Sequence, residues 1–112
     1  MNALGYVGAV LSMLAGVLGL IWPRPVSARI GLALPSPLAV SEFRATNGGL
    51  FIGSGVAVIV SGSTTAAAVL GAAWGGAFLA RALSVLIDRS RSKENMAGLV
   101  IEGLMAAMLL LA

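Results

Sequence analysis

The longest uncharged stretch of the chain runs from Ala45 to Ala80, a length of 36 residues bounded on each side by an arginine. A bilayer core is about 30 Å thick, and a helix crosses it with about 20 residues. The stretch is therefore too long for one membrane span and long enough for two. Its middle holds the sequence Ser-Gly-Ser-Thr at residues 61–64, and such residues favour a reversal of the chain. We predict a helical hairpin within the membrane.

The composition indicates that lipid surrounds this chain. Of its 112 residues, 59% are hydrophobic and 10% are charged, whereas soluble domains carry about 25% charged residues. A water-soluble fold of this size would bury only about two-thirds of its surface, so polar residues are too few to cover the rest. Cys and His are both absent, which excludes disulfides, Cys/His zinc sites, His-ligated haem and His-based triads. We expect no metal, no cofactor and no catalytic residues.

Hydropathy divides the chain into four predicted spans, at about residues 3–22, 43–60, 65–87 and 96–112. The third span contains Arg81 and the fourth contains Glu102. No Lys or Arg precedes the first apolar run, which is longer than the usual 7–15 residues of a signal peptide, so we expect a span rather than a cleaved leader. The expected fold is an all-α integral membrane protein, with residues 1–112 forming a single four-transmembrane-helix bundle.

The connection after the first span, at residues 23–41, contains all four prolines of the chain. It cannot be one straight helix, because proline interrupts helical hydrogen bonding. Its apolar middle, residues 30–34, is too short to cross a bilayer. We therefore predict an interfacial or re-entrant segment here. The connection at residues 88–95 is by contrast a charged turn.

Basic residues predict the orientation, because short loops rich in Arg and Lys stay in the cytoplasm. Five of them lie in the two connections on one side of the predicted bundle: Arg24, Arg29, Arg89, Arg91 and Lys93. We expect a multi-pass protein of the inner (plasma) membrane with both termini extracytoplasmic. The net charge of +3 then reflects orientation and attraction to anionic lipid, and we expect no nucleic-acid partner.

Small residues recur every four positions along the predicted helices. The positions are Gly8, Ser12 and Gly16 on the first span, Gly49 and Gly53 on the second, and Gly71 and Gly75 on the third. Such spacing lets helix backbones approach closely in a membrane. Two interpretations stay open: the small residues pack the bundle internally, or one stripe docks a different subunit.

Polar residues at membrane depth form a candidate ligand-binding or structural cluster, since charges there need a partner or a water-filled cavity. Its members are Glu42, Arg44, Asn47, Arg81 and Glu102. Arg81 precedes Asp88 by seven residues and Glu102 follows Glu94 by eight, so both lie about 10–12 Å from the same charged turn. Their equal depth on antiparallel helices predicts an Arg81–Glu102 ion pair.

The second span offers a further partner for Arg81. At about 100° per residue, Glu42 shares a face with Gly49 and Gly53, so we expect it to face the bundle and receive the Arg81 guanidinium. Arg44 lies on the opposite face with Asn47; it extends to lipid phosphates, or reaches Glu102 if the helix is rotated. The four charges sum to zero, which favours a structural clamp over a site for a headgroup, ligand or proton.

One pattern runs from the second span to the chain end: Glu-Phe-Arg-Ala-Thr-Asn-Gly-Gly-Leu at Glu42 to Leu50, then Gly53, then Arg81 with Ala82 and Leu83, then Glu102. It resembles a family of small bacterial four-span membrane proteins, domain of unknown function 4345. Its most specific part is Glu-x-Arg-Ala-x-x-Gly-Gly, and this chain has Asn47 where an aromatic residue is expected. The resemblance implies a four-helix membrane bundle in which these four charged residues belong together, and it implies no activity.

Two functions compete on this sequence. The leading one is a non-enzymatic accessory subunit that packs against a larger membrane complex or oligomerises with itself, because the chain has no room for a soluble catalytic domain. The alternative is a small lipid- or hydrophobe-binding protein, a carrier or a proton-transfer enzyme, with a pocket between helices near Arg81, Glu102, Glu42 and Asn47. Glu102 would transfer the proton in such an enzyme. A third possibility, a self-assembling transporter, requires Glu102 unpaired in a pore.

Overall fold

A computed structural model describes all of residues 1–112 as helices joined by short connections, and it contains no strand. The elements are α1 (Ala3–Ile21), α2 (Pro23–Arg29), α3 (Pro37–Arg44), a π-helical turn (Ala45–Gly49), α4 (Leu50–Ser61), α5 (Thr64–Ile87) and α6 (Lys93–Leu110). The all-helical class expected from the sequence is confirmed.

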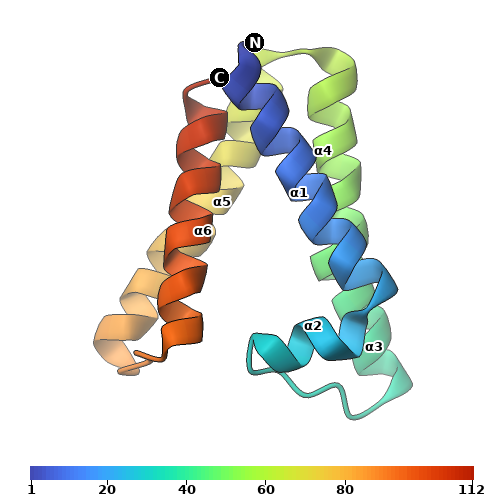
Figure 1. Cartoon of the computed structure of the whole chain (residues 1–112), viewed down its shortest axis with the longest axis vertical. Helices are drawn as coiled ribbons and strands as arrows, with labels where there is room; N and C mark the ends of the chain where they lie inside the picture. Colours follow the sequence, from blue (N-terminus) through green and yellow to red (C-terminus); the bar gives the residue numbers. More distant parts are fainter.

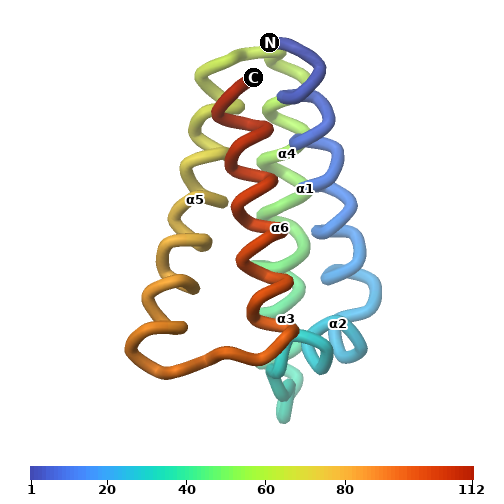
Figure 2. The backbone as a smooth tube through the Cα atoms, turned by 60° about the vertical axis from the view of Figure 1, so that its left-hand side comes forward, coloured from blue at the N-terminus to red at the C-terminus, as the bar shows by residue number.

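The long helices form two pairs that meet at one end and diverge toward the other, in the shape of an inverted V (Figure 1). One pair is α1 with α4 and the other is α5 with α6. Both termini and the α4–α5 turn lie at the closed end, where the side chain of Asn2 donates a hydrogen bond to the carbonyl of Leu111 at 2.9 Å. The short helices α2 and α3 and the α5–α6 turn lie at the open end (Figure 2).

Small residues form the buried face of α1: Gly5, Gly8, Ala9, Ser12, Gly16 and Gly19. A Cβ atom at Gly8 would lie 2.7 Å from the side chain of Leu109 on α6, and one at Gly16 would lie 2.6 Å from the carbonyl oxygen of Gly48. These distances are shorter than normal contacts, so α1 approaches its neighbours at positions that only small residues allow. The small-residue stripe of the first helix is thus used inside the chain.

The second long helix begins earlier than the sequence predicted. It is continuous from Pro37 to Ser61, a length of 25 residues, whereas the predicted span started at residue 43. Pro37 fits the first helical turn, where its missing N–H has no partner to lose. The Ser36 hydroxyl accepts from the amide of Ala39 at 3.1 Å and caps this end. The connection therefore reduces to α2 and residues 30–36, which run across the open end (Figure 1).

The packing positions on this second helix also differ from the predicted ones. Gly48 and Gly55 face α1, and a Cβ atom at Gly55 would lie 2.9 Å from the carbonyl oxygen of Ala9. A Cβ atom at Gly53 would meet nothing within 4 Å, and one at Gly49 only its own helix, at 4.0 Å. At about 100° per residue, Gly48 and Gly55 share one face, which lies about a third of a turn from the face of Gly49 and Gly53. The helix is rotated so that the face of Gly48 and Gly55 packs against α1.

The α4–α5 turn lies where the sequence placed it. Gly62 ends α4 with a positive φ of 59°, a conformation that a residue without Cβ adopts at little cost. The hydroxyl of Ser63 then accepts from the amide of Ala66 and caps α5. Further along α5, Gly71 and Gly75 face α6, where Cβ atoms would lie 3.0 Å and 3.8 Å from the side chains of Leu109 and Ala106.

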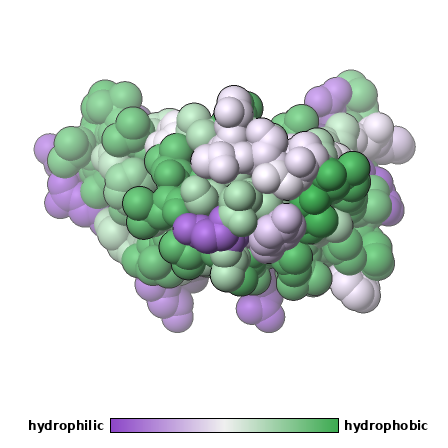
Figure 3. All heavy atoms as spheres, turned by 90° about the horizontal axis from the view of Figure 1, so that it is seen from above, coloured by the Kyte–Doolittle hydropathy of each residue, from purple (hydrophilic) through white to green (hydrophobic).

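Three helices are long and apolar enough to cross a membrane: α1, the helix from Pro37 to Ser61, and α5. Large hydrophobic side chains cover their outward surfaces, as at Val60, which is 80% exposed. Seen from the end that carries the termini, hydrophobic residues surround a central patch of intermediate hydropathy, and hydrophilic residues lie mostly at the periphery (Figure 3). These surfaces indicate a membrane protein. The fourth predicted span, α6, is not among the three, and its first turn holds Lys93 and Glu94.

Candidate functional site

The divergence of the two helix pairs leaves a groove of about 700 Å³ between α4 and α5. Twelve of its 17 lining residues are hydrophobic. The apolar walls include Leu50, Phe51 and Val58 on α4 and Val69, Leu70 and Trp74 on α5. The polar residues that also line it are Asn47, Ser54, Arg81 and Glu102. We refer to this space as the groove.

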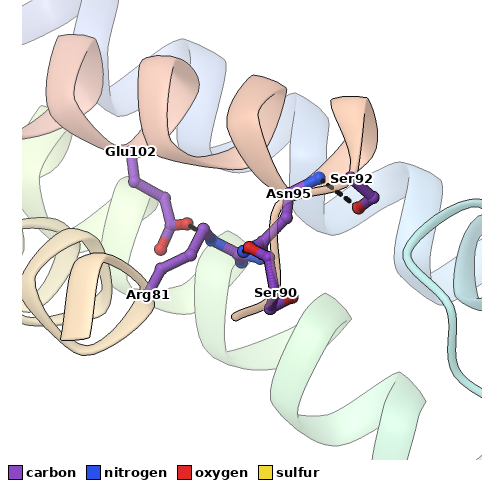
Figure 4. Close-up of polar contacts among 5 residues, drawn as sticks. All are labelled: Arg81, Ser90, Ser92, Asn95 and Glu102. Atoms are coloured by element: carbon purple, nitrogen blue, oxygen red, sulfur yellow. Dashed lines mark hydrogen bonds and ion pairs between the residues drawn. The ribbon is translucent and has the colours of Figure 1, made fainter. Parts of the chain in front are cut away.

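Arg81 and Glu102 form an ion pair between α5 and α6 (Figure 4). The Nε of Arg81 donates to Oε1 of Glu102, whose side chain is only 6% exposed, whereas that of Arg81 is 37% exposed. The guanidinium lies over Gly98, one turn before Glu102, where a Cβ atom would come within 2.9 Å of its Cζ. Every buried polar side-chain atom has a hydrogen-bond partner. The pair therefore meets the rule that buried charges need partners.

Asn95 completes this arrangement and was missed as a site residue by sequence reasoning. Nη1 of Arg81 donates to its Oδ1 at 2.7 Å, and its Nδ2 donates to the carbonyl of Ser90 at 2.7 Å (Figure 4). The Asn95 amide thereby joins the guanidinium to the α5–α6 turn. A signal was present, because Asn95 precedes Glu102 by seven residues and so lies on the same face of a helix.

The structure divides the remaining members of the predicted polar cluster. Glu42 is exposed and does not reach Arg81. Gly49 and Gly53, with which Glu42 was expected to share a bundle-facing side, meet no other helix within 4 Å, and the π-helical turn at Ala45–Gly49 separates them from Glu42. Nη1 of Arg44 donates to the carbonyl of Leu20 at the end of α1, rather than reaching Glu102.

Asn47 lines the groove, and its side chain donates to the hydroxyl of Thr46 at 3.1 Å. It lies in the π-helical turn, a local irregularity that is frequent at functional sites. Asn47, Arg81 and Glu102 are thus the predicted cluster residues that line one space.

Trp74 links the two helix pairs and was not singled out from the sequence. Its Nε1 donates to the hydroxyl of Ser12 on α1 at 2.9 Å, and that hydroxyl donates to the carbonyl of Gly8 at 2.9 Å. Its ring also lies 5.0 Å from the ring of Phe51, centroid to centroid. An indole N–H within a membrane protein usually needs a hydrogen-bond acceptor. A tryptophan in the middle of a predicted span could therefore have been identified from the sequence as a residue that needs a polar partner. Trp74 forms a wall of the groove and holds α5 against α1.

A second cavity, of about 870 Å³, adjoins the groove at the open end, and only three of its 12 lining residues are hydrophobic. Both cavities share Ile30, Arg81 and Gly98. We call this second space the mouth. No group of three or more His, Cys, Asp or Glu side chains could hold a metal ion, so the site offers apolar contact, hydrogen bonds and charge.

The sequence matches, over residues 1–112, the family described as Domain of unknown function (DUF4345). The chain belongs to this family. The resemblance seen in the sequence is therefore confirmed, and the match also includes the first helix, which the quoted motifs did not cover. No curated protein and no solved structure matches the chain. The family description assigns no activity.

Proposed function

We propose that the protein binds a membrane lipid, whose acyl chain lies in the groove between α4 and α5. The observation that carries this proposal is a space of about 700 Å³ with mostly apolar walls and a few polar residues. Small-molecule sites are typically about 300–1,000 Å³, apolar, with a small number of placed polar groups. The surrounding helices expose leucine and valine side chains, so the molecules that meet the groove from this side are lipids.

The length and direction of the groove support an acyl chain as its occupant. Ala66 and Arg81, which both line it, are about 22 Å apart along α5 at about 1.5 Å per residue. This distance exceeds half the thickness of a bilayer core, about 15 Å. The groove also follows α5, so a chain in it lies along the same direction as the chains of the bilayer. One leaflet-length acyl chain therefore fits.

The proposal includes a placement in the inner (plasma) membrane, with α6 as a fourth span and both termini extracytoplasmic. In support, the connections that carry the five basic loop residues lie together at the open end, and both termini lie at the closed end (Figure 1). Basic loops favour the cytoplasmic side. Arg81 on α5 and Glu102 on α6 form an ion pair. Because neither charge is then left without a partner, α6 is able to lie within the hydrocarbon core of the membrane.

Trp74 provides a test, because it is in the groove wall. Trp22, the other of the two tryptophans, is replaced by phenylalanine so that the fluorescence comes from Trp74 alone. Lipid with brominated acyl chains is then added to the protein in detergent, and quenching of Trp74 fluorescence is recorded. We expect saturable quenching that Ala77→Phe, which fills the groove, strongly reduces. Ala72→Phe is the control, since Ala72 is exposed and does not line the groove. Equal quenching in both variants would contradict the proposal.

The accessory-subunit function, which the sequence favoured, is the second candidate here, supported by one observation. Gly49 and Gly53 point outward with no other helix within 4 Å, so the backbone of a partner helix can approach there. The partner would be a larger membrane complex or a second copy of the chain. Gly53→Leu should then abolish co-purification or self-association. Gly76→Leu, at another open glycine on α5, should leave it intact. Loss in both variants or in neither would count against this candidate.

A further inference from the structure

We infer that the mouth recognises an anionic lipid headgroup, one that carries a phosphate with no compensating cation. This inference rests on the proposed acyl-chain groove and adds the class of lipid. The mouth and the groove share Ile30, Arg81 and Gly98. Because the two spaces adjoin at these residues, a chain in the groove places its headgroup at the mouth.

The side chains around the mouth are predominantly basic. The cationic ones are Arg29 from the end of α2, Arg81 from α5 and Lys93 from the start of α6. The acidic ones are Glu94 and, bound to Arg81, Glu102, so the balance is +1. Arg29 and Lys93 make no ion pair in the structure, where the Arg81–Glu102 pair is the only one. Two cations therefore remain available to an anion.

Hydrogen-bond donors accompany these charges. A guanidinium has five N–H groups, and Arg81 uses one at Nε for Glu102 and one at Nη1 for Asn95. The hydroxyl oxygen of Ser92 accepts a hydrogen bond from the backbone N–H of Asn95, so its own O–H is free to donate. Ser90 contributes a second hydroxyl to the same lining. Phosphate oxygens accept strong, charge-assisted hydrogen bonds from such groups.

The lining of the mouth disfavours a choline headgroup. Quaternary ammonium groups are recognised by aromatic faces, and no aromatic side chain lines the mouth. Glu94, next to the unpaired Lys93 in the sequence, is the one carboxylate in this lining, and Glu102, which lines the groove, is already paired with Arg81. A lipid whose phosphate is its only charge matches this balance better than a zwitterionic one with the same chains.

The experiment compares two lipids with identical brominated chains, phosphatidylglycerol and phosphatidylcholine, by the quenching of Trp74 in the Trp22→Phe protein. We expect phosphatidylglycerol to reach half-saturation at a concentration about five- to tenfold lower, the effect of one or two basic residues near an anion. The difference should narrow at high salt, which screens exposed charges. Inorganic phosphate at millimolar concentration should leave the quenching unchanged, because the chain supplies much of the binding.

The matched variants separate the mouth from general basicity. Arg29→Gln with Lys93→Gln should bring the ratio for the two lipids close to one. Arg24→Gln with Arg91→Gln removes one charge each from α2 and the α5–α6 turn, at residues outside the mouth, and should keep the ratio. A fold check by circular dichroism accompanies both.

The outcomes distinguish the two proposals. Equal half-saturation for the two lipids in the parent protein overturns the headgroup inference and leaves the groove intact. If inorganic phosphate displaces the lipid, the mouth binds a free anion, and the inference of a lipid headgroup site is overturned. A loss of selectivity in the control double variant also overturns it. Absence of saturable quenching by either lipid overturns the groove itself.

Discussion

The guanidinium of Arg81 crosses α6 over the backbone of Gly98, where a Cβ atom would come within 2.9 Å of both Cζ and Nε. This crossing lets the side chain bind Glu102 and Asn95 on either side of the glycine along α6. The glycine therefore serves the ion pair rather than backbone-to-backbone packing, and it couples the polar side of the groove to the joint between α5 and α6.

Gly98→Ala should destabilise the protein because the added methyl group displaces the guanidinium from its two partners. We expect a loss of about 1–3 kcal/mol, the range for disturbing hydrogen bonds of buried polar groups. Gly76→Ala is the control, because its Cβ atom would meet nothing within 4 Å and alanine is the better helix former. Thermal unfolding in detergent measures both, and equal effects would contradict this role of Gly98.

A double-mutant cycle tests the ion pair. Glu102→Gln leaves the Arg81 guanidinium without its counter-charge, and we expect a loss of about 1–3 kcal/mol, below the 3–5 kcal/mol of fully buried pairs because Arg81 is 37% exposed. Arg81→Met combined with Glu102→Gln should recover part of this loss. The coupling energy follows from the unfolding free energies of four proteins: the parent, Arg81→Met, Glu102→Gln and the double variant. A coupling energy near zero would refute the pairing.

Trp74→Phe should loosen the contact between the two helix pairs. It removes the hydrogen bond from Nε1 to the Ser12 hydroxyl, which is worth about 0.5–1.5 kcal/mol. Trp22→Phe provides the control, because Trp22 is 51% exposed and should change the unfolding free energy little. Ser12→Ala combined with Trp74→Phe should cost less than the two single changes added together. Strict additivity would show that the hydrogen bond contributes nothing.

Gly16→Leu and Gly53→Leu should have opposite consequences for folding. At Gly16 a side chain meets the Gly48 carbonyl oxygen, 2.6 Å from the Cβ position, and backbone cannot move aside easily. We expect the first variant to lose monodisperse elution and helical signal, whereas Gly53→Leu keeps both, because its side chain points to open space. A folded Gly16→Leu protein would contradict the packing of α1 on the second helix.

The proposed orientation has a labelling test that uses the natural absence of cysteine. Ser63 lies in the turn at the closed end and Ser90 in the turn at the open end (Figure 1). Ser63→Cys should react with a membrane-impermeant thiol reagent from outside intact cells, and Ser90→Cys only after permeabilisation. Reaction of both from the same side would rule out the four-span topology.

Sequence alone determined the features that depend on distance along a helix or on local turn chemistry. The turn at residues 61–64 follows from Gly62 and the capping hydroxyl of Ser63, which act on their immediate neighbours. Arg81 and Glu102 could be matched because each residue adds about 1.5 Å, so equal counts from the α5–α6 turn give equal depth. The family resemblance also depended on residues alone.

Tertiary structure decided how each helix is rotated about its axis and where space remains between helices. Periodicity placed Gly49 and Gly53 on one face, but only close packing of Gly48 and Gly55 against α1 shows that this face points outward. In an isolated helix, either glycine face could pack against a neighbouring helix. Which face does so depends on contacts with residues distant in the sequence. The groove has the same origin: it exists because α4 and α5 diverge from their turn, held by pairing to α1 and α6.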